Sequence, residues 1–130
     1  MADVPYLSQA WLDRQRELGG GLPERPGATA TVQHVVSGAP AGEVRYAHAI
    51  VDGRLAAARL GNDPAAEVTL TQTYADAVLI ARGELDGNVA FMQGRVKVVG
   101  DMGKVMALMP LTDSDEYRDV VAELAAQTTF

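Results

Sequence analysis

Residues 68–111 carry the clearest pattern in this chain, VTLTQTYADAVLIARGELDGNVAFMQGRVKVVGDMGKVMALMPL. The stretch opens by alternating Val68 and Leu70 with threonines, which indicates a strand with one buried face. The period then changes: TYADAVLIARG fits a helix with Thr73 as N-cap and Gly83 past its end, and its interior, residues 77–81, is apolar on nearly every side, which predicts a helix covered by other elements. A short turn or helix and a second strand, RVKVV, follow. The pattern therefore predicts a strand-helix-strand unit.

The end of this stretch predicts a helix rich in methionine. Four of the chain's five methionines lie between residues 90 and 111. Asp101 is placed to cap the helix, and Pro110 should end it because the residue before a proline is pushed out of the α region. Such a helix usually packs a core, but flexible thioethers also suit surfaces that meet varied apolar partners, and both interpretations stay open. The spacing i, i+3, i+4, i+7 predicts one apolar stripe of Met102, Val105, Met106 and Met109.

The sequence before residue 66 predicts a helix followed by a three-stranded meander. Ser8 is a suitable N-cap for a helix that stops at the glycines of residues 19–21. Strands rich in β-branched residues are expected within residues 28–61. Asp52 and Gly53 form a tight hairpin signal there, since a type I′ turn requires positive φ.

An amphipathic helix is expected at the end of the chain, over residues 112–127. Its first turn is acidic, and the positive end of a helix dipole favours that sign. One face collects the apolar side chains Tyr117, Val120, Val121, Leu124 and Ala125.

Together these elements predict an α+β fold. A three-stranded antiparallel meander and the strand-helix-strand unit would form a single five-stranded mixed sheet, covered by helices with an apolar cavity between. The chain of 130 residues is long enough to bury a core of its own, so we expect a single domain over residues 1–130. Its expected parts are an N-terminal helix and loop (1–27), the meander (28–61), the strongly patterned half (66–111) and a C-terminal helix (112–127).

Composition limits the classes of function. The net charge of -6, from 17 acidic and 11 basic residues, disfavours nucleic acid as a partner and allows at most transient contact with a membrane. Cysteine is absent, which fits a reducing cytosol and excludes thiolate metal sites, and we expect neither a metal nor a cofactor. No signal peptide or membrane-spanning segment is evident in the sequence, so a cytoplasmic location is expected. The Ala- and Gly-rich composition is compatible with a bacterial origin.

Residues 68–111 resemble the C-terminal half of the sterol carrier protein type 2 family of small intracellular lipid-transfer domains. Four family features occur in order: a strand, a helix that ends in Gly83, the motif A-F-x-x-G-[KR]-[ILV]-K-[ILV] from Ala90, and the helix start G-[DN]-M-G from Gly100. The fold known for the family agrees with the order of elements expected above, although before Val68 only the strand pattern is similar. The last residues, QTTF, lack a Ser-Lys-Leu address, so a peroxisomal location is not expected.

This resemblance implies a hydrophobic tunnel between sheet and helices that binds a fatty acid, acyl-CoA, sterol or other apolar molecule for transfer or sequestration. Such binding needs no catalytic group. A partner enzyme is possible, but the resemblance does not identify one. The C-terminal helix is a candidate lid through Val120, Val121 and Leu124, or simply a packing helix. Gln93 would either contact a ligand oxygen or cap local backbone. The cavity residues carried over from the family are Phe91, Met92, Gln93, Val96, Val98, Met102, Val105, Met106 and Met109.

The alternative function is a small-molecule enzyme that uses the same cavity. His34 and His48 both fall on strand positions whose neighbours of the same parity are apolar, and His48 with Tyr46 could perform acid-base chemistry. A histidine at such a position is more often a hydrogen-bonded core residue, and the sequence has no G-x-S-x-G or H-E-x-x-H motif. A third possibility is an accessory domain that only stabilises a partner.

Overall fold

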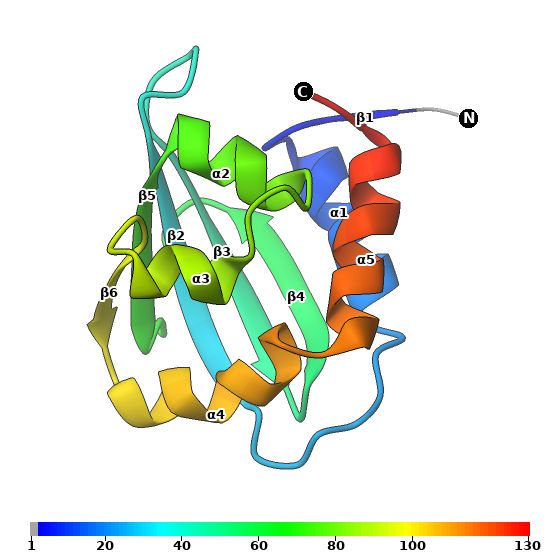
Figure 1. The fold of residues 1–130 in the computed structure, drawn as a ribbon, viewed down its shortest axis with the longest axis vertical. Helices are drawn as coiled ribbons and strands as arrows, with labels where there is room; N and C mark the ends of the chain where they lie inside the picture. Colours follow the sequence, from blue (N-terminus) through cyan, green and yellow to red (C-terminus); the bar gives the residue numbers. More distant parts are fainter. Residues whose placement is uncertain (1–2) are drawn as a thin grey trace.

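A five-stranded mixed sheet is the frame of residues 3–130, the part of the chain that this computed structural model describes. The strands lie in the order β4-β3-β2-β5-β6, and every neighbouring pair is antiparallel except β2 and β5, which are parallel (Figure 1). The α+β prediction is therefore confirmed, with the meander and the strand-helix-strand unit joined through β2 and β5. The strands are β2 Ala30–Ser37, β3 Val44–Val51, β4 Arg54–Leu60, β5 Val68–Thr73 and β6 Lys97–Gly100.

The helices gather on one face of this sheet (Figure 1). Each of them has a side-chain N-cap, whose oxygen accepts a backbone N–H that the first turn would otherwise leave unpaired. Within residues 3–130, no helix has the length and apolar content to cross a membrane. The helices and their caps are α1 Gln9–Gly19 (Ser8), α2 Tyr74–Ala81 (Thr73), α3 Gly87–Met92 (Asp86), α4 Met102–Thr112 (Asp101) and α5 Asp115–Ala126 (Ser114).

Two short strands bring the ends of the described chain together. β1 (Val4–Pro5) pairs in parallel with β7 (Thr128–Thr129), and the Val4 backbone N–H donates to the Gln127 carbonyl at 2.8 Å. The sequence pattern did not predict this pair, because two residues are too few to show a periodicity. Beneath it, α1 and α5 pack with the sheet in one core cluster that includes Trp11, Leu12 and Leu124.

The expectation that Pro110 ends the methionine-rich helix is wrong. α4 continues through Pro110 to Thr112. The proline deprives only the Met106 carbonyl of its helical partner, and Met106 is 63% exposed, so water is available there. Beyond the proline, Leu111 is only 2% exposed, and its burial favours the last helical turn.

Gly100 makes the sharp passage from β6 into α4. Its φ of +128° lies in a region that side chains other than glycine rarely adopt. Any Cβ there would also press on the neighbouring strand, because it would lie 2.9 Å from the Val68 Cα and closer still to the Glu67 carbonyl oxygen. The same Glu67 carbonyl accepts the Asp101 backbone N–H at 3.0 Å, which ties the start of α4 to the sheet.

Gly100→Ala is therefore expected to lower the unfolding free energy by about 3 kcal/mol, from backbone strain and the clash with β5 combined. Gly87→Ala is the matched control, since a Cβ at Gly87 meets nothing within 4 Å and its φ is ordinary; it should change stability by less than about 1 kcal/mol. Urea denaturation of both variants measures the difference. Equal effects would contradict this account of Gly100.

Candidate ligand-binding pocket

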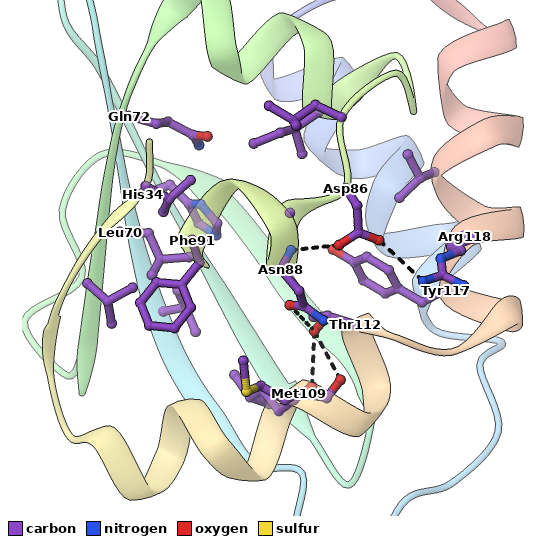
Figure 2. Close-up of a pocket in the computed structure, with 18 of the residues that line it drawn as sticks. His34, Leu70, Gln72, Asp86, Asn88, Phe91, Met109, Thr112, Tyr117 and Arg118 are labelled. Carbon is purple, nitrogen blue, oxygen red and sulfur yellow. Dashed lines mark hydrogen bonds and ion pairs between the residues drawn. The ribbon is translucent and has the colours of Figure 1, made fainter. Parts of the chain in front are cut away.

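A pocket of about 550 Å³ lies between the helix-covered face of the sheet and the helices (Figure 2). Its floor comes from alternate residues of β2 and β5 together with Val96 and Val98 beside them. Its other walls come from the end of α2 and the inward faces of α3, α4 and α5. The apolar side chains that line it include Val32, Leu70, Ile80, Phe91, Leu108 and Met109.

The register of the sheet explains which floor residues face the pocket. In the parallel β2–β5 pair, Val32 lies beside Val68, and His34 lies beside Leu70. Because side chains alternate along a strand, these residues and Gln72 project to the same face. Two distant stretches of sequence therefore build one floor.

The structure brings together part of the predicted cavity set. Phe91, Val96, Val98, Val105 and Met109 line the pocket. The others do not line it: Gln93 is exposed, and Met92, Met102 and Met106 are 75%, 47% and 63% exposed.

Only two of the four residues in the predicted α4 stripe, Val105 and Met109, face the pocket; Met102 and Met106 do not. The side of α4 that faces the pocket carries Val105, Leu108, Met109 and Thr112, which have the same i, i+3, i+4, i+7 spacing as the methionine stripe. Both stripes are present in the sequence, and the abundance of methionine favoured the wrong one. The burial of Leu108 and Leu111 fixes the observed rotation of the helix.

A second, smaller pocket of about 190 Å³ adjoins the first. The two share wall residues that include His34, Leu70, Gln72 and Ile80. Aromatic side chains, among them Tyr6, Trp11 and Tyr46, line the smaller pocket. The candidate lid residues also lie here: Val121 lines both pockets, whereas Val120 and Leu124 line only the smaller one.

Polar side chains connect α3, α4 and α5 at the rim of the larger pocket (Figure 2). The Arg118 guanidinium contacts Asp86 at 3.3 Å and Asp113 at 3.0 Å, and the Thr112 hydroxyl donates to Asn88 Oδ1 at 3.0 Å. Arg118 is half exposed, so each of these ion pairs contributes little by itself. In residues 3–130, no three His, Asp or Glu side chains are grouped so as to hold a metal ion.

The two histidines lie in one aromatic cluster, in which His34 lines both pockets and His48 lines only the smaller one. The His34 ring stacks on Tyr46 with centroids 4.5 Å apart, and His48 Nε2 lies 2.8 Å from Gln15 Oε1. Burial lowers the pKa of His48 from 6.5 to about 4, and burial together with the nearby His48 lowers the pKa of His34. Burial also raises the pKa of Tyr46 well above 10. The cluster is therefore uncharged at neutral pH.

The comparisons with known proteins identify the class to which this fold belongs. The model of the SCP-2 sterol transfer family matches residues 29–113, and the chain belongs to that family. No curated protein matches the sequence. The family supports lipid binding or transfer in general, and neither it nor the similar structures support the enzymatic alternative.

Several solved structures share the fold. A crystal structure of sterol carrier protein 2 has a TM-score of 0.69 at 15% identity, covering 91% of this chain and 98% of that one. A Thermus thermophilus protein described as a possible sterol carrier protein has a TM-score of 0.68 at 14% identity, with 96% and 93% covered. Palmitated SCP2L2 from Aedes aegypti has a TM-score of 0.63 at 17% identity, with 86% and 96% covered.

Acidification from pH 7 to pH 5 should destabilise the protein through its histidines. Both folded-state pKa values are lowered, so the unfolded chain binds protons between about pH 6.5 and 4 that the folded chain does not bind. Stability that is complete above pH 6.5 is therefore lost as the pH falls. His48 should account for about 2 kcal/mol of unfolding free energy over this interval.

Urea denaturation at both pH values tests this expectation, with His48→Asn as the comparison. The chain has only two histidines, so the substitution should remove about half of the histidine-dependent loss. A loss of the same size in the variant would show that His48 is not its source.

Proposed function

We propose that this chain binds one apolar molecule with a single extended hydrocarbon body in the larger pocket and transfers or sequesters it inside the cell. The observation that carries the proposal is the pocket of about 550 Å³, most of whose lining side chains are aliphatic or aromatic. That volume lies within the usual range for small-molecule sites. Membership in the SCP-2 sterol transfer family supports the same class of ligand.

Burial of hydrocarbon provides enough free energy for such binding. Removing roughly 300 Å² of apolar ligand surface from water contributes about 7 kcal/mol at 25 cal/mol per Å², before the entropic cost of association. No ion pair is required, and the remaining free energy corresponds to weak or intermediate affinity, which suits a carrier that must also release its ligand. Fatty acids, acyl-CoA and sterols are the ligand classes that the family resemblance brings forward, and the palmitated Aedes aegypti structure is a precedent for the first.

Entry of the ligand is proposed to involve α5 as a lid. Val121 lines both pockets, so a displacement of α5 would open them together. The helix is held at its N-terminal half by exposed ion pairs, Arg118 with Asp86 and Arg25 with Glu116 at 3.1 Å, which are weak individually. Its C-terminal end is held more firmly, by Leu124 in the core and by the β1–β7 pair. Opening from the N-terminal half is therefore favoured.

Two substitutions on α4 test the binding site. Met109 lines the pocket, so Met109→Glu would place a carboxylate against the bound hydrocarbon and should weaken binding at least about tenfold. Met106→Glu is the matched control, because Met106 lies on the same helix but outside the pocket lining, and its binding should change less than about twofold. Titration with a fluorescent long-chain fatty acid measures both, with circular dichroism to verify folding.

The unmodified protein should bind this probe saturably and with 1:1 stoichiometry. Absence of saturable binding would refute the proposed function. Equal weakening in the two variants would place the ligand elsewhere on the molecule.

A further inference from the structure

Two buried polar atoms on the pocket floor have no hydrogen-bond partner. These are Gln72 Oε1 on β5 and His34 Nδ1 on β2. Gln72 is only 9% exposed, and both residues line the two pockets where these share a wall. Buried polar atoms in folded proteins are nearly always paired, since leaving one unpaired is costly, so this pair calls for a partner from outside the chain.

The sheet register brings the two side chains together. His34 pairs with Leu70 and Val36 pairs with Gln72 across the parallel β2–β5 ladder, so His34 and Gln72 are diagonal neighbours on one face. Figure 2 shows both projecting from the floor toward the pocket interior. The other buried glutamine, Gln33, projects to the opposite face, where its amide contacts the Tyr46 and Gly61 carbonyls and the Asp63 backbone N–H. Of the two buried glutamines, only the one on the pocket side therefore has an amide oxygen without a partner; the other unpaired buried atom of the described residues, Arg25 Nε, lies outside both pockets.

The charge around these atoms selects the chemistry of that partner. Burial and the adjacent His48 lower the pKa of His34, so its ring is neutral at pH 7 and presents no cation. The lining arginines, Arg82 and Arg118, are exposed: Arg82 lies 4.9 Å from the centre of the Phe130 ring, and Arg118 is paired with carboxylates. A carboxylate at the floor would lose its hydration without gaining a counterion, which is unfavourable.

A hydroxyl group has the properties that the floor requires. It is uncharged, it donates one hydrogen bond and it accepts others. It can therefore donate to Gln72 Oε1 and interact with His34 Nδ1 at the same time. An ether oxygen can only accept, and so it would leave the amide oxygen unpaired.

We propose that His34 and Gln72 form an internal hydrogen-bonding site for the hydroxyl group of a neutral lipid, so that the ligand is bound with its polar end at the floor. This assignment rests on the proposed function and adds the polar chemistry of its ligand. Gln72 and His34 then determine specificity, whereas the apolar walls supply affinity.

Three probes of equal chain length separate hydrogen bonding from hydrophobicity: dodecan-1-ol, its methyl ether and dodecanoate, each displacing a fluorescent hydrocarbon probe at pH 8. A purely apolar pocket would prefer the ether, which is the most hydrophobic of the three. The unmodified protein should instead prefer the alcohol, by about fivefold over the ether and by more over dodecanoate.

Gln72→Leu should abolish the preference for the alcohol over the ether, measured as the ratio of the two affinities within the variant. Gln93→Leu is the matched control, since Gln93 is exposed and outside the lining, and it should keep the preference. A second readout is the ¹⁵N chemical shift of His34 Nδ1, which should change when dodecan-1-ol is added and not when the ether is added.

The outcomes are distinct. If the unmodified protein prefers the ether, if Gln72→Leu retains the preference for the alcohol, or if the His34 Nδ1 shift is insensitive to the alcohol, the hydroxyl site is refuted and the proposed function remains. If neither the probe nor any of the three compounds binds, both proposals fall.

Discussion

The parallel pairing of β2 with β5 is the contact on which the rest of this structure depends. It is the only parallel contact in the five-stranded sheet, and it joins β2, whose other partner is its neighbour in the meander, to β5, which begins more than 30 residues after β2 ends. A pair of such separation requires closure of a long loop before any hydrogen bond forms, and the apolar floor residues on both strands favour that closure. The same register then sets which side chains face the helices. The β2–β5 pairing therefore determines both the order of the sheet and the residues of the pocket floor.

Local signals in the sequence were sufficient for most elements of the fold. Ser8, Thr73 and Asp101 begin helices as expected, and Asp52 and Gly53, with φ of +48° and +82°, form the predicted hairpin turn. These features depend on a few adjacent residues, which explains why they can be recognised in one sequence. Pro110 misled because its local effect on the helix was outweighed by the burial of Leu111, a tertiary contact.

The candidate site was less accessible to prediction for the same reason. Phe91, Val98 and Met109 were reached through a family motif, but the floor residues His34 and Gln72 belong to strands whose relative register no local pattern specifies. Parity along β2 placed His34 correctly toward a covered face, yet nothing in the sequence indicated its neighbour on β5. The rotation of α4 was similarly undetermined, since two stripes with equal spacing compete on that helix. Only packing against the sheet distinguishes Leu108 from Met106.

The pairing of β1 with β7 gives the pocket wall an unusual dependence on the chain ends. α5 is followed directly by β7, whose partner β1 precedes α1, so a segment near the N-terminus helps to hold a helix near the C-terminus. An affinity tag or fusion partner attached at either end would disturb this two-residue strand pair. Through the pair it would also disturb α5, the helix that borders both cavities. Placement of such an extension is therefore a variable in any binding measurement on this protein, and an insertion in the exposed turn around Gly42, where an added Cβ would meet nothing within 4 Å, would avoid it.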